Sequence, residues 1–289
     1  MFRKETDLIM EKVVFICGVL TIVFVVLIFG FLFKEGFLFF KEYGVFKFLT
    51  GKLWYPTSNP AMYGVLSLIV GSILVTLGAI AIAVPLGIMS ALYISEIAPS
   101  WIKDILKSGV ELMAAIPSVV IGFVGMVTLV PLVRTVFDIP TGLTAFSGSI
   151  MLAFMAMPTI VSISEDAIRS VPWSYKEGAY ALGATKWQTI RRIVLKNAMP
   201  GIIAAVMLGI GRVIGETMAV MMITGNAAHI PSSIFEPVRT LTATIAAEMG
   251  ETVKGGIHYR ALFAIGLVLF AITFIINFIA DLFLNKNRK

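Results

Sequence analysis

Residues 165–225 read EDAIRSVPWSYKEGAYALGATKWQTIRRIVLKNAMPGIIAAVMLGIGRVIGETMAVMMITG. The first part, residues 165–199, is a long charged segment in an otherwise apolar sequence. The second part is an apolar run of membrane length that contains Arg212 and Glu216 near its middle. A polar docking segment that leads directly into a membrane helix with internal charges indicates that binding outside the membrane is coupled to passage of a substrate through it. We therefore interpret the chain as a transport permease.

Composition places the whole chain among membrane proteins. Of its 289 residues, 58% are hydrophobic and 14% are charged, whereas soluble domains carry about 25% charged residues. The net charge of +6 is explained by basic loops between long neutral runs, not by a nucleic-acid surface. The single cysteine, Cys17, excludes an intrachain disulfide. The first apolar run, residues 13–33, exceeds the ~7–15 residues of a cleavable signal core, so we expect it to be a retained helix.

Charged residues bound six predicted membrane spans. The spans are residues 13–33, a span within 61–94, and residues 112–133, 143–164, 200–224 and 261–280. The sequence allows two structures for the second span, because a helix over 61–94 would reach about 50 Å, longer than the ~30 Å hydrocarbon core. It is either one long tilted helix or an interfacial segment followed by a span. Gly64, Gly71 and Gly78 lie seven residues apart, so we expect them to permit close helix packing.

The division of basic residues predicts the orientation. Six spans place both termini on the side of residues 96–107 and 165–199, which carries fourteen Lys and Arg residues against eight on the other side. The positive-inside rule puts that side in the cytoplasm. We expect an all-α, multi-pass protein of the cytoplasmic (inner) membrane. Residues 1–60 would form an N-terminal helix and first outer loop, and 61–289 a permease core with a cytoplasmic loop (165–199) and an outer loop (225–260).

The cytoplasmic loop contains two predicted short helices. The first begins near Ser170 and Pro172, with a capping hydroxyl and a proline in the first turn, and stops near Gly183. The second covers residues 186–196, with apolar residues at three- and four-residue spacing opposite basic ones. The first helix is too short to be stable alone and needs a partner surface. The alternative is an ordinary basic loop that lies on anionic lipid headgroups.

The first of these helices resembles the EAA loop of ATP-binding-cassette (ABC) importer permeases. The resemblance rests on the sequence Glu177-Gly178-Ala179 followed by Gly183-Ala184, and on Ile193 nine residues later. It implies a type I (MetI-like) importer permease whose short loop helix sits in a cleft of a separate ATPase subunit. By this resemblance, coupling to the ATPase is assigned to Glu177, Gly178, Ala179, Gly183 and Ala184. Two departures are that Gly178 replaces the usual alanine and that Pro200 follows later than in the family pattern.

Arg212 lies near the middle of the fifth predicted span. An arginine at a helix centre costs about 2.5–3.5 kcal/mol even on the lenient insertion scale. Glu216 is four residues further on, so it shares a face with Arg212 and could partly neutralise it. One interpretation is a structural ion pair that locks two helices together. The other is a positive site on an anion path, oriented by Glu216 and assisted by the Thr217 hydroxyl, because a guanidinium fork suits phosphate or carboxylate oxygens.

Two further segments, residues 209–220 and 237–246, resemble the PstC-type permeases of phosphate ABC importers. With the EAA loop, this resemblance covers most of residues 165–251. It implies a second, PstA-type permease, two PstB-type ATPases that use ATP and Mg²⁺, and an external PstS-type phosphate-binding protein. It also implies that transport depends on Arg212 and Glu216. The residues themselves support an anion path, and phosphate comes from the resemblance.

Other functions are less compatible with the sequence. No Walker A motif occurs, so we expect this chain neither to bind nor to hydrolyse ATP and to hold no cofactor. His229 and His258 have no helical or cysteine partner, so no metal site is expected, and Arg239 is taken as an ordinary exposed charge. A stand-alone ion-coupled anion transporter with Glu216 as proton carrier is the main alternative, but no inverted repeat is seen. An intramembrane enzyme lacks a catalytic constellation within the spans.

Overall fold

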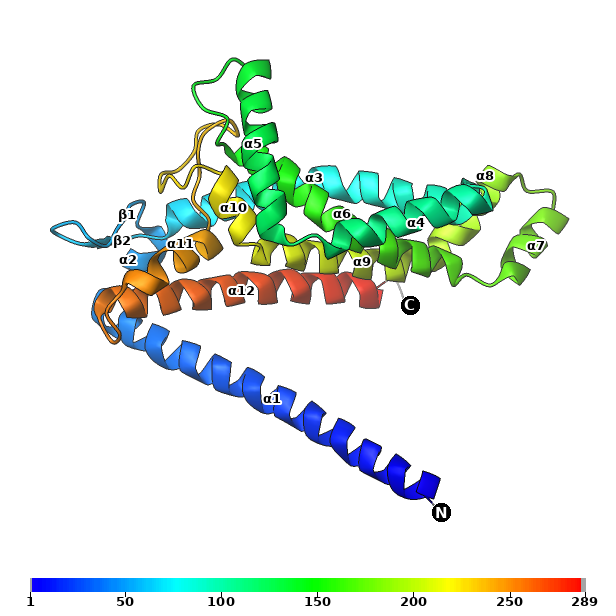
Figure 1. The fold of residues 1–289 in the computed structure, drawn as a ribbon, viewed down its shortest axis with the longest axis horizontal. Helices are drawn as coiled ribbons and strands as arrows, with labels where there is room; N and C mark the ends of the chain where they lie inside the picture. Colours follow the sequence, from blue (N-terminus) through cyan, green and yellow to red (C-terminus); the bar gives the residue numbers. More distant parts are fainter. Residues whose placement is uncertain (1, 287–289) are drawn as a thin grey trace.

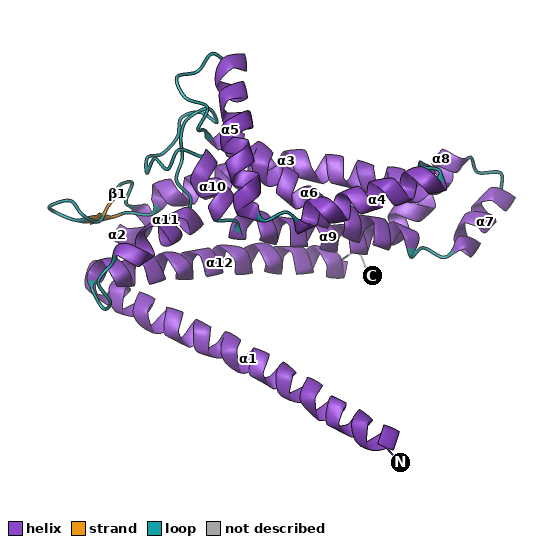
Figure 2. Cartoon of the chain, viewed as in Figure 1, coloured by secondary structure: helices purple, strands orange, loops and turns teal. Residues whose placement is uncertain are grey.

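The described part of the chain is a helical membrane protein with one short hairpin. The computed structural model describes residues 2–286, most of which are helical (Figure 2). Six helical segments are long and apolar enough to cross a membrane: Met10–Tyr43, Leu66–Ile97, Ser118–Val136, Ala145–Arg169, Lys186–Gly215 and Ile257–Ile279. The predicted six-span, all-α architecture is therefore confirmed. The end of the predicted basic tail, residues 287–289, lies outside the described residues.

The elements follow one another along the chain as in Figure 1. The first half contains α1 (Phe2–Tyr43), α2 (Val45–Thr50), β1 (Trp54–Tyr55), β2 (Met62–Tyr63), α3 (Leu66–Leu92), the π-helix η1 (Tyr93–Ile97), α4 (Ser100–Ala115) and α5 (Ser118–Val136). The second half contains α6 (Ala145–Arg169), α7 (Trp173–Ala181), α8 (Lys186–Thr189), the π-helix η2 (Ile190–Val194), α9 (Leu195–Gly215), α10 (Met218–Ile223), α11 (Leu241–Glu248), the 3₁₀-helix η3 (Met249–Glu251) and α12 (Ile257–Lys286).

Helices α3, α6, α9 and α12 run alongside one another and form the body of the molecule (Figure 1). The N-terminal end of α1 and the C-terminal end of α12 lie toward the end that carries α7 and α8. The hairpin β1–β2 and helix α11 lie at the opposite end. Helix α1 contacts α12 near the hairpin end and then diverges from the bundle (Figure 1). Because every residue from Met10 to Phe31 is exposed, this part of α1 offers its apolar surface to lipid or to another chain.

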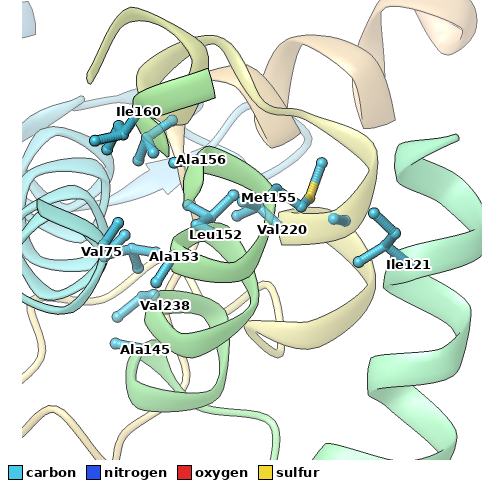
Figure 3. Packing of buried hydrophobic residues seen from close by; sticks show 14 residues of the cluster. Val75, Ile121, Ala145, Leu152, Ala153, Met155, Ala156, Ile160, Val220 and Val238 are labelled. Carbon is cyan, nitrogen blue, oxygen red and sulfur yellow. The ribbon is translucent and has the colours of Figure 1, made fainter. Parts of the chain in front are cut away.

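The core of the bundle is the interface between α3 and α6. Small residues let the two backbones approach closely: a side chain at Gly78 would collide with Ser149, and one at Gly87 with Ile160. The Ser149 hydroxyl also donates to the Val75 carbonyl across the interface, at 3.2 Å. Figure 3 shows Val75 of α3 beside the α6 residues in this core. Close contact between small residues is how membrane helices gain packing energy without a hydrophobic driving force.

The open question about the second span is resolved in favour of one long helix. Helices α3 and η1 are continuous over Leu66–Ile97, and residues 62–63 belong to β2 instead. A side chain at Gly71 would collide with the backbone of Arg239, so this glycine permits close packing as predicted. Gly64 lies before the helix and packs against the backbone of Gly51.

The first and third predicted spans have wrong boundaries. Helix α1 continues to Tyr43 through the charged residues Lys34 and Glu35, so the first outer loop is shorter than residues 34–60. The third span begins at Ser118, because Pro117 is the N-cap of α5 (φ −60°, ψ 139°) and does not lie inside a helix. A proline lacks the N–H that continues a helix from the preceding turn, and it fits at a helix start.

Candidate functional site

The fifth predicted span is broken where its acidic residue lies. Helix α9 ends at Gly215, Glu216 has extended backbone (ψ 134°), and α10 begins at Met218, so the prediction of a continuous helix over 200–224 is wrong. The Glu216 Oε1 atom accepts hydrogen bonds from the N–H groups of Met218 (3.1 Å) and Ala219 (3.2 Å). The carboxylate thus caps α10 and replaces helical bonds that the break removes.

Hydrogen bonds from two hydroxyl groups also stabilise this break. The Thr242 hydroxyl of α11 donates to the carbonyl of Glu216 at 2.8 Å, and the Thr217 hydroxyl donates to the carbonyl of Gly215 at 3.2 Å. Carbonyls that a continuous helix would satisfy internally are therefore bonded to side chains, which is how irregular backbone is tolerated at membrane depth. Glu216 and Thr217 are structural parts of the break in this chain.

Arg212 lies one turn before the break and reaches across to α6. Its Nη1 donates to the hydroxyl of Thr159 at 3.2 Å, a contact between residues 53 positions apart. Arg212 forms no ion pair with Glu216 or with any other carboxylate within residues 2–286. The predicted neutralisation by Glu216 is therefore not found, and Thr159 is a partner that sequence reasoning missed.

Most N–H donors of the Arg212 guanidinium have no hydrogen-bond partner among the described residues. A guanidinium has five N–H donors, and Arg212 makes a single hydrogen bond among the described residues. None of its nitrogens is among the buried polar atoms that lack a partner, so the remaining donors reach the surface of the chain. A partly exposed cation that is fixed in position by one hydroxyl can accept an oxyanion without first breaking an ion pair. The described structure gives no ion pair to support the helix-locking alternative.

The five residues of the predicted coupling motif lie together at the other end of the bundle. Glu177, Gly178 and Ala179 are in α7, where the first two are exposed and Ala179 is buried. Gly183 has the left-handed conformation (φ +79°) that ends a helix, as predicted. The N–H of Ala184 then bonds to the carbonyl of Ala179 at 3.0 Å. The motif is thus one helix with its terminating turn, at the opposite end of the bundle from α10 and α11 (Figure 1).

The start of α7 differs from the prediction, whereas the next helix agrees with it. Ser170 is the C-cap of α6, and its hydroxyl bonds to the carbonyl of Ala167 (2.8 Å), so it does not cap α7. The predicted helix over 186–196 is present and continues without interruption into α9. Thr185 and Gln188 form a capping box at its start, a signal that the sequence contains and that the prediction overlooked.

A network of polar side chains joins the elements at the hairpin end of the bundle. The Glu248 carboxylate accepts hydrogen bonds from Trp54 Nε1 (3.0 Å), Arg239 Nη1 (2.8 Å) and His258 Nε2 (2.8 Å). Arg239 is therefore a partly buried ion-pair partner, and its interpretation as an ordinary exposed charge is wrong. The described residues contain no group of three or more metal-ligating side chains. The network thus joins the hairpin, α11 and α12 through one carboxylate.

His229 has a separate partner in the same outer loop. Its Nε2 atom lies 3.3 Å from the Glu236 carboxylate, which also accepts the N–H of Ser232 at 2.9 Å. These hydrogen bonds lower the pKa of Glu236, the bond from Ser232 most strongly. Both side chains of the pair are partly exposed to solvent.

Glu248→Gln should lower the stability of the purified chain. The substitution removes the charge that pairs with Arg239 and accepts the hydrogen bond of His258, and a hydrogen bond to a charged group contributes about 1.5–3 kcal/mol. We expect the thermal unfolding midpoint in detergent to fall by about 4–8 °C. Glu251→Gln, a change at a nearby exposed glutamate, is the control and should leave the midpoint unchanged. Equal midpoints for both variants would contradict the structural role of the network.

Comparison with known proteins shows that the chain is similar to membrane permeases of one family. Residues 83–289 match the family described as binding-protein-dependent transport system inner membrane component. A probable ABC transporter permease protein of Bacillus subtilis, YqgH, is 42% identical over 281 residues, which cover 96% of this chain and 91% of that protein. The phosphate transport system permease protein PstC of Mesorhizobium japonicum is 38% identical over 81% of this chain and 77% of its own length.

Solved structures give the same fold. A bacterial alginate ABC transporter, solved with an alginate-bound periplasmic protein, contains a chain with a TM-score of 0.65 and 16% identity. That match covers 95% of this chain and 94% of the other. The MetNI methionine ABC transporter in an inward-facing conformation gives a TM-score of 0.57 at 20% identity, covering 80% of this chain and 99% of the other. At these identities the likeness establishes the fold, the MetI-like permease architecture, and nothing about substrate.

Proposed function

The chain belongs to the binding-protein-dependent transport system inner membrane components, and we propose that it is a permease subunit of an ATP-driven importer for inorganic phosphate. It is a multi-pass inner membrane protein with the MetI-like fold. The observation that carries the proposal is the open guanidinium of Arg212 beside a broken membrane helix, in a chain whose relatives include phosphate permeases.

Arg212 would contact the phosphate as it passes between two permease subunits. The guanidinium of a single chain is open on one side, so a second, homologous permease (PstA-type) would complete the path around it. Phosphate oxygens accept two parallel hydrogen bonds from a guanidinium fork, which gives both attraction and orientation. Thr159 positions the guanidinium, while Glu216 and Thr217 keep the helix open at this depth.

The end that carries α7 would face the cytoplasm and receive the ATPase. Fourteen basic residues on this side of the sequence support that orientation. Helix α7 leaves Glu177 and Gly178 exposed for contact with a PstB-type ATPase subunit, of which an importer has two. ATP and Mg²⁺ would be used there and not by this chain. A PstS-type phosphate-binding protein would deliver the substrate at the opposite end.

Reconstitution tests the function directly. We expect the chain, a second permease, the ATPase and the binding protein to purify as one complex and to hydrolyse ATP faster in liposomes when phosphate-loaded binding protein is present. Sulfate and arsenate in place of phosphate measure the selectivity. A complex that sulfate stimulates and phosphate does not would contradict the assignment of the substrate.

Purified alone, the chain should show neither nucleotide turnover nor transport. The reason is that the sequence has no Walker A motif to cradle the phosphates of ATP. The measurement is ATP hydrolysis by the single subunit, together with phosphate uptake into proteoliposomes under an imposed proton gradient. Gradient-driven uptake by the single subunit would favour the stand-alone, ion-coupled anion transporter in which Glu216 carries the proton.

A further inference from the structure

A buried ion pair connects helix α7 to the end of α3. Lys176 and Ala179 are the two buried residues of this nine-residue helix. The ammonium of Lys176 donates to the carboxylate of Glu96 at 2.6 Å, and each of the two side chains is 10% exposed. Glu96 lies in η1, at the end of α3 and 80 residues away in sequence. The Trp173 ring covers the ammonium at 5.4 Å.

Stability alone is a poor explanation for this pair. The desolvation of two charges offsets most of their attraction, so an apolar pair of similar volume would hold α7 at least as firmly. Removal of one partner, in contrast, leaves an unpaired buried charge and is strongly unfavourable. The pair therefore makes separation of α7 from α3 costly and fixes one geometry. A nine-residue helix has little stability of its own, so contacts with neighbouring elements set the position of α7. It packs against α8 and η2, and this pair ties it to η1 at the end of α3.

The α3 end of the pair is anchored in a well-packed region. Ile94, two residues before Glu96, is buried in a cluster with Val161 and Ile168 of α6. A second set of ion pairs lies close by in the fold, where Lys107 of α4 contacts the buried Glu165 of α6 at 2.9 Å. This hydrogen bond raises the pKa of Lys107 above its usual value and so favours the charged form. The ends of α3, α4 and α6 are thus connected to one another.

We propose that the Glu96–Lys176 pair transmits the movement of α7 to the substrate path. A displacement of α7 would pull α3 through this pair, and the close packing of α3 on α6 would carry it to Thr159 and the attached Arg212. Glu96 and Lys176 are positioning residues that act through other groups. The inference rests on the proposed function, in which α7 is the contact with the ATPase.

A distance measurement in the assembled complex tests the link. In a background in which Cys17 is replaced by serine, spin labels are placed at the exposed positions Ser174 and Met89. We expect one narrow distance distribution that is the same in the nucleotide-free and the ATP-trapped complex. Lys176→Met should broaden and shift the distribution, and Lys186→Met, at an exposed lysine of the next helix, should not.

Transport supplies the second readout. Phosphate transported per ATP hydrolysed should fall by about tenfold in Lys176→Met and in Glu96→Gln, because each leaves a buried charge without its partner. The exchanged pair, Glu96→Lys with Lys176→Glu, should recover to within about threefold of the parent, because it restores opposite charges. Co-purification of the ATPase with every variant checks that the loop still folds.

Three results would overturn the proposal. The first is a Ser174–Met89 distance that changes between nucleotide states in the parent. The second is a Lys176→Met variant that keeps both the distance and the transport ratio. The third is an exchanged pair that stays uncoupled. Failure of the phosphate assignment is distinguishable, because the distance measurement uses ATP alone and requires no transported substrate.

Discussion

Phosphate uptake should fall by at least about 100-fold when Arg212 is replaced by methionine, because the loss of two charge-assisted hydrogen bonds to phosphate costs about 3–6 kcal/mol. Methionine keeps an unbranched apolar stem of similar length. It also costs less than arginine at bilayer depth, so insertion of the chain should not suffer. The measurement is radiolabelled phosphate uptake into proteoliposomes that contain equal amounts of assembled complex.

The Thr159→Val variant tests the position of the Arg212 guanidinium separately from its charge. The substitution removes the hydroxyl that accepts from Arg212 at 3.2 Å and leaves the guanidinium in place. We expect a smaller loss of uptake, about 3–10-fold, because the guanidinium keeps its charge and its open donors and loses only one hydrogen-bond partner. Full uptake by Arg212→Met at normal membrane levels would show that phosphate does not pass this guanidinium. A larger loss in Thr159→Val than in Arg212→Met would show that the hydroxyl itself is the essential group.

The membrane spans and the end of α7 could be predicted from the sequence. The six spans follow from charged residues that interrupt apolar runs, since a charge is costly in the hydrocarbon core wherever it lies. The turn at Gly183 can also be predicted from the sequence, because a helix end with positive φ favours glycine. Both signals are local, so a single sequence contains them.

The break after Gly215 depends on contacts that are not local. The run around Glu216 is apolar on both sides and predicts a continuous helix. In the structure the Glu216 side chain caps α10, and Thr242, 26 residues away, bonds to the Glu216 carbonyl. The pairing of Arg212 with Thr159, and of Lys176 with Glu96, likewise requires knowledge of which helices are neighbours. One sequence does not provide those neighbours, so the spacing of Arg212 and Glu216 suggested a pair that the fold does not form.

Glu177→Lys should abolish the coupling of ATP hydrolysis to uptake while leaving the chain folded in the membrane. Glu177 is exposed on α7 and has no ion-pair partner within residues 2–286, so no contact within the chain is lost. A reversed charge at the centre of a protein interface typically costs more than about 2 kcal/mol, which corresponds to at least a ~30-fold loss of uptake. Phosphate-stimulated hydrolysis by the reconstituted complex measures the coupling, and membrane content of the subunit measures folding.

Glu111→Lys is the matched control, because Glu111 is also an exposed glutamate of a short helix, α4, outside the six spans. Its reversal changes the net charge of the chain by the same amount, so a general electrostatic effect on membrane association would appear in both variants. Loss of stimulated hydrolysis in Glu177→Lys alone places the ATPase contact on α7. Undiminished uptake in Glu177→Lys would remove α7 from the coupling route, and the ion pair between Lys176 and Glu96 would then have nothing to transmit.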